Sequence, residues 1–355
     1  MSQWLHRQWL TRGWLSVLMR PFSWVVLIIL AMRKKSYLYF PSRIYQARVP
    51  VLVIGNIYVG GTGKTPVVIA LVKALTQKGW HPGVISRGYG VEISVTPRIG
   101  QGVLAPDQFG DEPALIAHQT GAPIAVHPNR KSAIEALLAY APETDLIVSD
   151  DGLQHLALAR NLEIIVQDQR LVGNGCVMPA GPLRETIDRL EYVHAIVTNV
   201  AQRDLLGQSD FTRPSGGVTT LPKTTNMALQ IGLFRNLKHH QTLTVTQFQD
   251  LIFGQSLAAA AGIGAPERFF ESLRSKGFVL NETLALPDHH SFTANTFFSL
   301  QSRHILITAK DAIKCEHLQD ERLGVVEVDA VFSDPEFTDW LSQALRTDCT
   351  DAPLH

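Results

Sequence analysis

A glycine-rich segment next to a lysine and a threonine carries the clearest chemistry in this sequence. Residues Val49–Gly55 are short, apolar and β-branched, which predicts a buried strand. The loop NIYVGGTGKTP follows, and residues 67–79 then read as a helix. This order predicts a phosphate-binding loop, because glycines let backbone N–H groups close on phosphate oxygens while the helix N-terminus adds a positive dipole.

Lys64 can reach the β- and γ-phosphates of a nucleotide, and the Thr65 hydroxyl can bind Mg²⁺. We expect the nucleotide to contact Tyr58, Val59, Gly60, Gly61, Thr62, Gly63, Lys64 and Thr65. The strict pattern GxxxxGK[ST] fails at its first position, Tyr58, and the variant with a lysine at position 59 fails at Val59. A plain strand-to-helix turn is the alternative, but it does not account for three glycines beside Lys-Thr.

Two carboxylates end a second predicted strand, DLIVSDD, at Asp150 and Asp151. This is the usual place for the acid that orients Mg²⁺ beside a phosphate loop. Loop solvation or a helix cap is the alternative. Spacing leaves open which acid contacts the metal.

Three further loops contain groups that suit phosphoryl transfer. Asp111 and Glu112 precede an apolar helix, where they could merely cap it. HPNR (127–130) opens another helix, and VMPAGPLRE (177–185) is a loop rich in proline and glycine. In that last loop Arg184 is a candidate to balance phosphate charge.

Composition excludes several classes of protein. The 355 residues suggest two domains, and 45% hydrophobic residues suffice for real cores. Lys+Arg and Asp+Glu are both 32, so a nucleic-acid binder that relies on bulk positive charge is excluded. Three scattered cysteines form no disulfide framework, which fits a reducing compartment.

Charge is unevenly distributed along the chain. Residues 1–91 hold twelve bases and no acid. The remaining residues hold 20 bases and 32 acids and therefore carry a net charge of −12. The basic end should prefer an anionic surface.

The first forty residues resemble a membrane contact. Four of the six tryptophans lie here (Trp4, Trp9, Trp14 and Trp24), and an apolar run, 21–32, precedes Arg33, Lys34 and Lys35. Twelve residues fall short of the roughly 20 that span hydrocarbon, and tryptophans beside bases suit the headgroup boundary. A buried helix and a cleaved signal peptide are the alternatives. Whether the segment spans the membrane or lies in it stays open, and the basic cluster predicts that the following chain is cytoplasmic.

We therefore predict an α/β protein with a P-loop NTPase-type parallel-sheet domain and a smaller second α/β domain. Residues 1–40 would be the membrane-associated helical segment, 41–215 the kinase core, and 216–355 a unit with its own parallel sheet that closes over the nucleotide cleft. In this last unit we expect strands and helices at 256–264, 266–277, 304–312, 324–332 and 334–346. Lys310 and Asp311 would then face an interdomain cleft.

Taken together, the motifs GNxxxGGTGKTP, SRGYG, GDEP, SDDGLQH, PAGPLRE, LPDHHSF and TAKDAIK resemble tetraacyldisaccharide 4′-kinase, the lipid A 4′-kinase of Gram-negative bacteria. The resemblance covers about residues 10 to 345. It implies ATP- and Mg²⁺-dependent phosphorylation of the 4′-hydroxyl of a tetraacylated glucosamine disaccharide 1-phosphate, giving lipid IVA. It also implies a membrane glycolipid substrate, the cytoplasmic face of the bacterial inner membrane, no nucleic acid and no obligate protein partner.

The resemblance carries roles to individual residues. Asp111 matches the family's general base and His289 its assisting histidine, while Asp150 and Asp151 match the metal-proximal acids. Lys64 and Arg184 complete the expected catalytic set. Contacts to substrate are expected from Arg87, Tyr89, Glu112, Arg130, His155 and Glu185. The family shares the departure at Tyr58, and Ala309 is a minor departure of this chain.

Two other functions compete with a lipid-directed kinase. A membrane-tethered GTP switch needs an NKxD motif, which neither TNVAQRD nor TAKDA supplies. A non-catalytic scaffold with a relic loop conflicts with the intact Lys64, Thr65 and acid pair. The kinase is therefore the favoured interpretation.

Overall fold

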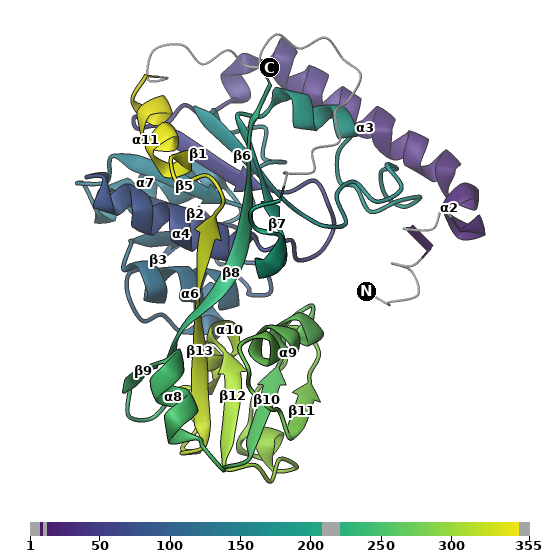
Figure 1. Cartoon of the computed structure of the whole chain (residues 1–355). Coiled ribbons are helices and arrows are strands. Elements are labelled where there is room, and N and C mark those ends of the chain that lie inside the picture. Colours follow the sequence, from purple (N-terminus) through teal and green to yellow (C-terminus); the bar gives the residue numbers. More distant parts are fainter. Residues whose placement is uncertain (1–7, 10–12, 208–220, 348–355) are drawn as a thin grey trace.

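The computed structural model describes residues 8–9, 13–207 and 221–347 of the 355-residue chain. It is a mixed α/β protein with two lobes, and the smaller lobe lies at the bottom of the view in Figure 1. A diagonal N-terminal helix lies against the larger lobe at the top (Figure 1).

One mostly parallel sheet of thirteen strands runs through both lobes. Its order is β11-β10-β12-β13-β8-β7-β6-β1-β5-β2-β4-β3, with β9 paired to β8. The strands are β1 Val51–Gly55, β2 Pro82–Ser86, β3 Arg98–Gly100, β4 Ile124–Val126, β5 Leu146–Asp150, β6 Leu162–Asp168, β7 Ala195–Asn199, β8 Lys223–Asn236, β9 Thr242–Thr244, β10 Leu257–Ala261, β11 Glu282–Ala285, β12 His304–Thr308 and β13 Leu323–Phe332. Only β3–β4, β8–β9 and β8–β13 pair antiparallel among these strands.

Helices cover both faces of this sheet. They are α2 Trp14–Leu18, α3 Arg20–Tyr39, α4 Lys64–Gln77, α5 Pro106–Phe109, α6 Asp111–Thr120, α7 Arg130–Tyr140, α8 Val245–Leu251, α9 Pro266–Ser275, α10 Ala309–Cys315 and α11 Phe337–Thr347. Short 3₁₀ turns span Pro41–Arg43, Ile187–Tyr192, Gln202–Asp204 and Ala294–Phe297. The predicted strands at β1 and β5 and the helices at α4, α9 and α11 are confirmed, with boundaries shifted by a few residues.

Alternation along β1 explains why this strand is central. Leu52 and Ile54 enter the core under α4 and α6, whereas Val51 and Val53 enter the core under α7. Successive strand side chains point to opposite faces, so a strand that is apolar at every position must be covered on both sides. The carboxyl end of β1 is thereby fixed between two packed layers, and the glycine loop begins there.

The two lobes share the sheet, and this corrects the expectation of a separate second sheet. Strand β8 pairs with β7 at its beginning and then antiparallel with β13, and the two long strands connect the lobes (Figure 1). Helix α11 returns to the larger lobe, where Trp80 donates a hydrogen bond of 3.0 Å to Ser342. The predicted boundary at residue 215 lies outside the described residues.

Helices α2 and α3 expose much of their apolar surface. Trp14, Phe22, Trp24 and Met32 are each more than half exposed. Two buried serines attach these helices to the body: the Ser16 hydroxyl donates to the Ala180 carbonyl at 2.5 Å, and the Ser23 hydroxyl to that of Val177 at 2.7 Å. Among the described residues, no helix combines the length and the apolar character needed to cross a membrane.

Candidate active site

The glycine loop between β1 and α4 has the backbone shape of a phosphate cradle. Gly60 and Gly63 have φ angles of 100° and 91°, a left-handed region that favours glycine. Gly63 is the N-cap of α4, so the positive end of that helix faces the loop. Gly60 and Gly61 are exposed, whereas the Thr62 side chain is buried.

Three side chains from the ends of neighbouring strands hold the carbonyls of this loop. Asn56 Nδ2 donates to the Gly60 carbonyl at 3.3 Å, Arg170 Nη2 to that of Gly61 at 2.7 Å, and Asn199 Nδ2 to that of Thr62 at 3.1 Å. Fixing the carbonyls outward leaves the N–H groups to face an anion. Our sequence reasoning missed Arg170 and Asn199. Their position just after β6 and at the end of β7 was the available signal.

Tyr58 serves this loop through packing. Its side chain is 1% exposed, and the Arg170 guanidinium lies 4.4 Å from the centre of its ring. The backbone on either side is bonded to the loop that contains Arg184: Val59 N donates to the Pro182 carbonyl and Arg184 N to the Ile57 carbonyl. Tyr58 as a whole is buried, so its visible role is to pack against the loop and Arg170.

Asp151 lies between the two predicted phosphate-binding cations. Lys64 Nζ is 3.3 Å from its Oδ1, and Arg184 Nη1 is 3.3 Å from its Oδ2. Burial alone would raise the pKa of Asp151, but the charges and hydrogen bonds of Lys64 and Arg184 hold it below its usual value. Asp151 also has a φ of 49°, a conformation that side chains rarely adopt and that clusters at functional sites.

Asp150 is in a different environment, one residue away. It is 1% exposed, and its Oδ1 atom has no hydrogen-bond partner among the described residues. Burial, followed by the negative charge of Glu112, raises its pKa to about 7. The loop-solvation alternative therefore does not fit Asp150. No group of three or more candidate metal ligands occurs within the part of the chain that the structure describes.

Arginines surround the far side of the acid pair. Arg130 is 2% exposed, donates from Nη2 to the Asp150 carbonyl at 2.9 Å, and has a pKa lowered by burial to about 10. Its Nη1 has no partner in the described residues. Burial, and then the charges of Arg130 and neighbouring arginines including Arg33 and Arg87, lower the pKa of His155 to about 4. This region is a positive, partly closed environment.

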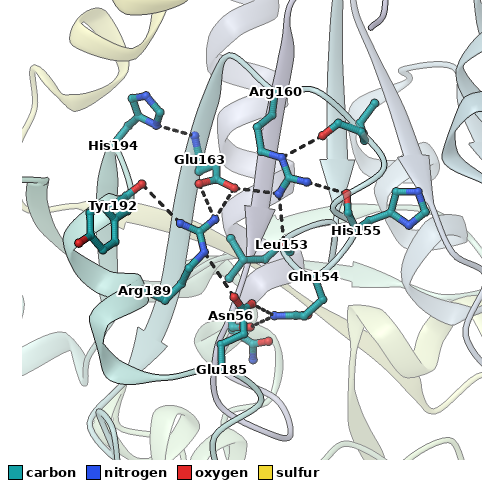
Figure 2. A network of polar contacts seen from close by, with 11 residues as sticks. Asn56, Leu153, Gln154, His155, Arg160, Glu163, Glu185, Arg189, Tyr192 and His194 are labelled. Atoms are coloured by element: carbon teal, nitrogen blue, oxygen red, sulfur yellow. Dashed lines mark hydrogen bonds and ion pairs between the residues drawn. The ribbon is translucent and has the colours of Figure 1, made fainter. Parts of the chain in front are cut away.

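A buried polar network supports the loop after Asp151 (Figure 2). Glu163 accepts hydrogen bonds from Arg160 and Arg189, and Arg160 also donates to the carbonyls of residues 153, 155 and 158. Arg189 Nε lies 3.4 Å from Glu185, which accepts from Gln154 at 2.6 Å. Burial raises the pKa of Glu185. Glu185 thus belongs to the framework that links the two loops carrying Asp151 and Arg184.

Asp111 and His289 meet across the two lobes. Asp111 is in the first turn of α6, and His289 Nδ1 lies 3.0 Å from its Oδ2. His289 is on the loop after β11 with a φ of 61°, and the ring of the exposed Tyr89 lies 6.0 Å from its ring. The N-cap of α6 is Gly110 with no side-chain cap, so Asp111 does not cap the helix by a hydrogen bond.

An open pocket lies beside this pair. It has a volume of about 340 Å³ and is lined by Arg87, Gly88, Tyr89, Gly90, Val91, Ile93 and Pro128. Arg87 and Tyr89 are exposed there, as a role in binding requires. Glu112 follows Asp111 on α6, and Thr65 follows Lys64 on α4; both are half-buried.

Two polar residues of the smaller lobe differ from expectation. Asp311 does not face an open cleft: it is fully buried and accepts hydrogen bonds from Gly262 N and the Thr308 hydroxyl. The predicted strand at 304–312 ends at Thr308, because that residue caps α10. Lys310 pairs with Asp288 at 3.0 Å, next to His289.

A glycine loop between a central parallel strand and a helix, with lysine, paired acids and arginines around it, defines an α/β protein of the phosphate-loop class. A family model described as Tetraacyldisaccharide-1-P 4'-kinase matches residues 15–346. The chain belongs to this family.

Curated relatives are similar in sequence to this chain over almost its whole length. The Tetraacyldisaccharide 4'-kinase of Bordetella parapertussis is 50% identical over 342 residues, with 96% of each chain covered. That of Bordetella petrii is 51% identical over 333 residues (94% of this chain and 92% of the relative), and that of Haemophilus influenzae 39% over 321 residues (90% of each).

A solved structure matches the fold. The crystal structure of LpxK from Aquifex aeolicus in complex with ATP has a TM-score of 0.76 and 24% sequence identity, and covers 94% of this chain and 99% of that chain.

Proposed function

We propose that this chain is an ATP-dependent tetraacyldisaccharide 4′-kinase. It transfers the γ-phosphate to the 4′-hydroxyl of a tetraacylated glucosamine disaccharide 1-phosphate, giving lipid IVA in lipid A biosynthesis. The observation that carries the proposal is the phosphate loop, with Lys64 and Arg184 on Asp151, in the same molecule as the Asp111–His289 pair. Family membership supports the choice of substrate.

Each reacting bond has a candidate residue. The 4′-oxygen forms a bond to the γ-phosphorus while the bond from that phosphorus to the β–γ bridging oxygen breaks, and ADP leaves. Asp111 takes the hydroxyl proton, and His289 assists by holding the Asp111 carboxylate. Lys64 and Arg184 stabilise the negative charge on the moving phosphoryl group.

The residues present suit Mg²⁺, which would neutralise charge on the nucleotide phosphates when bound. Asp150 has a buried oxygen with no partner among the described residues, while both oxygens of Asp151 already contact cations. We therefore propose that Asp150, with the Thr65 hydroxyl, holds the metal, and that Asp151 positions Lys64.

Arg87, Arg130 and His155 fit a second anion, which in this substrate is the 1-phosphate. The orphaned Nη1 of Arg130 and the positive charge around His155 support this role. The pocket beside Tyr89 would take part of the sugar. Glu112, whose charge acts on Asp150, would limit how much negative charge the site accepts, and Glu185 would support the substrate side through Gln154 and Arg189.

We further propose that α2 and α3 dock on an anionic membrane at the cytoplasmic face of the bacterial inner membrane. The exposed tryptophans Trp14 and Trp24 and the bases Arg33, Lys34 and Lys35 support docking at a headgroup boundary. The kinase core at 41–215 would then meet the lipid headgroup, and the unit at 216–355 would contribute His289 over the nucleotide.

The decisive experiment follows label from γ-labelled ATP into a diglucosamine glycolipid in detergent micelles. We expect labelled glycolipid, and no label with Lys64→Ala. The matched control is Lys73→Ala, because Lys73 lies on the same helix with its side chain 42% exposed. ATP turnover that is independent of glycolipid, without labelled product, would contradict the proposal and favour a nucleotide switch.

A further inference from the structure

Asp111 has a second neighbour besides His289, and this one is a lysine. Lys314, on helix α10 of the smaller lobe, places its Nζ 3.3 Å from Asp111 Oδ2, the same oxygen that faces His289 Nδ1 at 3.0 Å. Among the described residues, no hydrogen bond reaches the other oxygen, Oδ1. Both partners thus gather on one oxygen and leave the second to face a substrate.

The ammonium group of Lys314 is buried beside two carboxylates and an aromatic ring. Its Nζ atom has no hydrogen-bond partner of good geometry among the described residues, and it lies 5.2 Å from the centre of the Phe292 ring. Because a buried charge is costly unless it is paired, the carboxylates beside it must hold it there. Because the Asp111 and Asp311 carboxylates lie 3.3 and 3.7 Å from Nζ, the position of Lys314 is coupled to both of them.

Asp311 fixes the position of this lysine. It lies three residues earlier on α10, is fully buried, and has its Oδ1 3.7 Å from Lys314 Nζ. Its Oδ2 is held by Gly262 N at 2.9 Å and by the Thr308 hydroxyl at 2.8 Å. Asp311, Lys314 and Asp111 therefore form a line of alternating charge that begins in the smaller lobe and ends at the candidate base.

We propose that Lys314 is a positioning residue for Asp111. Together with His289 it holds Oδ2, so that Oδ1 is aimed at the hydroxyl whose proton it accepts. This inference rests on the proposed function, because it gives Lys314 a purpose only if Asp111 is the base. It also explains why the end of the TAKDAIK segment carries a lysine on the face of α10 that contacts α6.

A double-mutant cycle tests the proposal in the full-length enzyme. Lys314→Met keeps the length of the side chain and removes the charge. We expect kcat for glycolipid phosphorylation to fall about tenfold to a hundredfold, with the Kd for ATP changed less than about twofold. In an Asp111→Asn background the same substitution should cost less than about twofold, because the base it positions is already lost.

A second variant guards against a folding defect. Asp311→Asn keeps an oxygen for Gly262 N and Thr308 but removes the charge that holds Lys314. We expect a smaller fall in kcat, again absent in the Asp111→Asn background. Lys238→Met is the control, since Lys238 makes only a surface ion pair with Glu321 at 2.7 Å in the same lobe.

Two results would overturn the proposal. One is an unchanged kcat in Lys314→Met, and the other is the same fold-loss with and without Asp111, which is the signature of a general structural effect. The proposed function fails separately: if Asp111→Asn alone kept the kcat of the parent enzyme, Asp111 would not be the base. Additive losses would instead leave the role of Asp111 intact and remove only that of Lys314.

Discussion

On the phosphate-loop side, the carbonyls of three successive residues, Gly60 to Thr62, accept hydrogen bonds from side chains of the larger lobe alone. On the acid–histidine side, Asp111 is held by His289 and Lys314, which both come from the smaller lobe. The proposed nucleotide half of the site therefore lies within one lobe, whereas the proposed base half is assembled only while the lobes are in contact. Chemistry can thus be lost on one side while nucleotide binding persists on the other.

The sharpest way to break the nucleotide half is Lys64→Ala. Loss of the loop cation should lower kcat by about 10²–10⁴, because it acts on charge that develops in the transition state. Thermal unfolding should stay close to that of the parent, since Asp151, the ion-pair partner of Lys64 in the described residues, keeps its contact with Arg184. Turnover near the parent value would contradict the phosphate-loop interpretation.

Breaking the base half should separate catalysis from binding. Asp111→Ala should lower kcat by roughly 10²–10⁴ and leave ATP affinity almost unchanged, because the nucleotide contacts lie in the other half. His289→Ala should lower kcat less, since the histidine acts through Asp111. The measurement is kcat and ATP affinity across a Mg²⁺ titration. Rescue of Asp111→Ala by added Mg²⁺ would instead identify Asp111 as a metal-shell residue.

The proposed membrane-docking role of helices α2 and α3 should be separable from both halves. Replacing Trp14 and Trp24 together by alanine should weaken binding to anionic vesicles by on the order of tenfold or more, because buried aromatic surface contributes about 1.5–3 kcal/mol per side chain. Turnover in detergent micelles should change little. Tyr140→Ala is the control, since Tyr140 is 52% exposed on α7. Unchanged sedimentation of the double variant with vesicles would place the membrane contact elsewhere.

The smallest expected effect sharpens the role of the loop carbonyls. Asn199→Ala removes one hydrogen bond to Thr62, worth about 1 kcal/mol, so ATP affinity should weaken about fivefold. Saturating ATP should restore kcat, because the residue positions the loop and does not touch the reacting atoms. Isothermal titration with ATP measures the first effect. A loss of kcat that ATP cannot restore would mean that Asn199 does more than hold the loop.

Sequence alone predicted the elements whose signals are local. The apolar run of β1, the glycines after it and the acids after β5 follow from spacing and composition. The continuous sheet was not predicted, because the pairing of β8 with β13 joins residues about a hundred positions apart. Local alternation of strands and helices cannot tell one shared sheet from two.

The candidate site residues likewise fall into those that local motifs predict and those that only the tertiary structure brings to the site. Lys64, Asp150, Asp151 and Asp111 stand in recognisable motifs, and the structure places them near charged partners. Lys314 lies in the TAKDAIK motif, but the sequence predicts no role for it. Only the docking of α10 against α6 brings this lysine to Asp111. Asp311 was expected in a cleft, yet its carboxylate is buried and accepts hydrogen bonds from the Thr308 hydroxyl and from Gly262 N.

The buried serines of α2 and α3 have a consequence for protein preparation. Ser16 and Ser23 bind the carbonyls of Ala180 and Val177, and the same loop reaches the glycine loop through the contact of Pro182 with Val59. Cutting away the N-terminal helices to improve handling would leave these carbonyls without their partners and loosen the segment that carries Arg184. A shortened enzyme would therefore be a poor stand-in for inhibitor screening, since its weakened turnover would mix the loss of lipid access with a change in the catalytic loop.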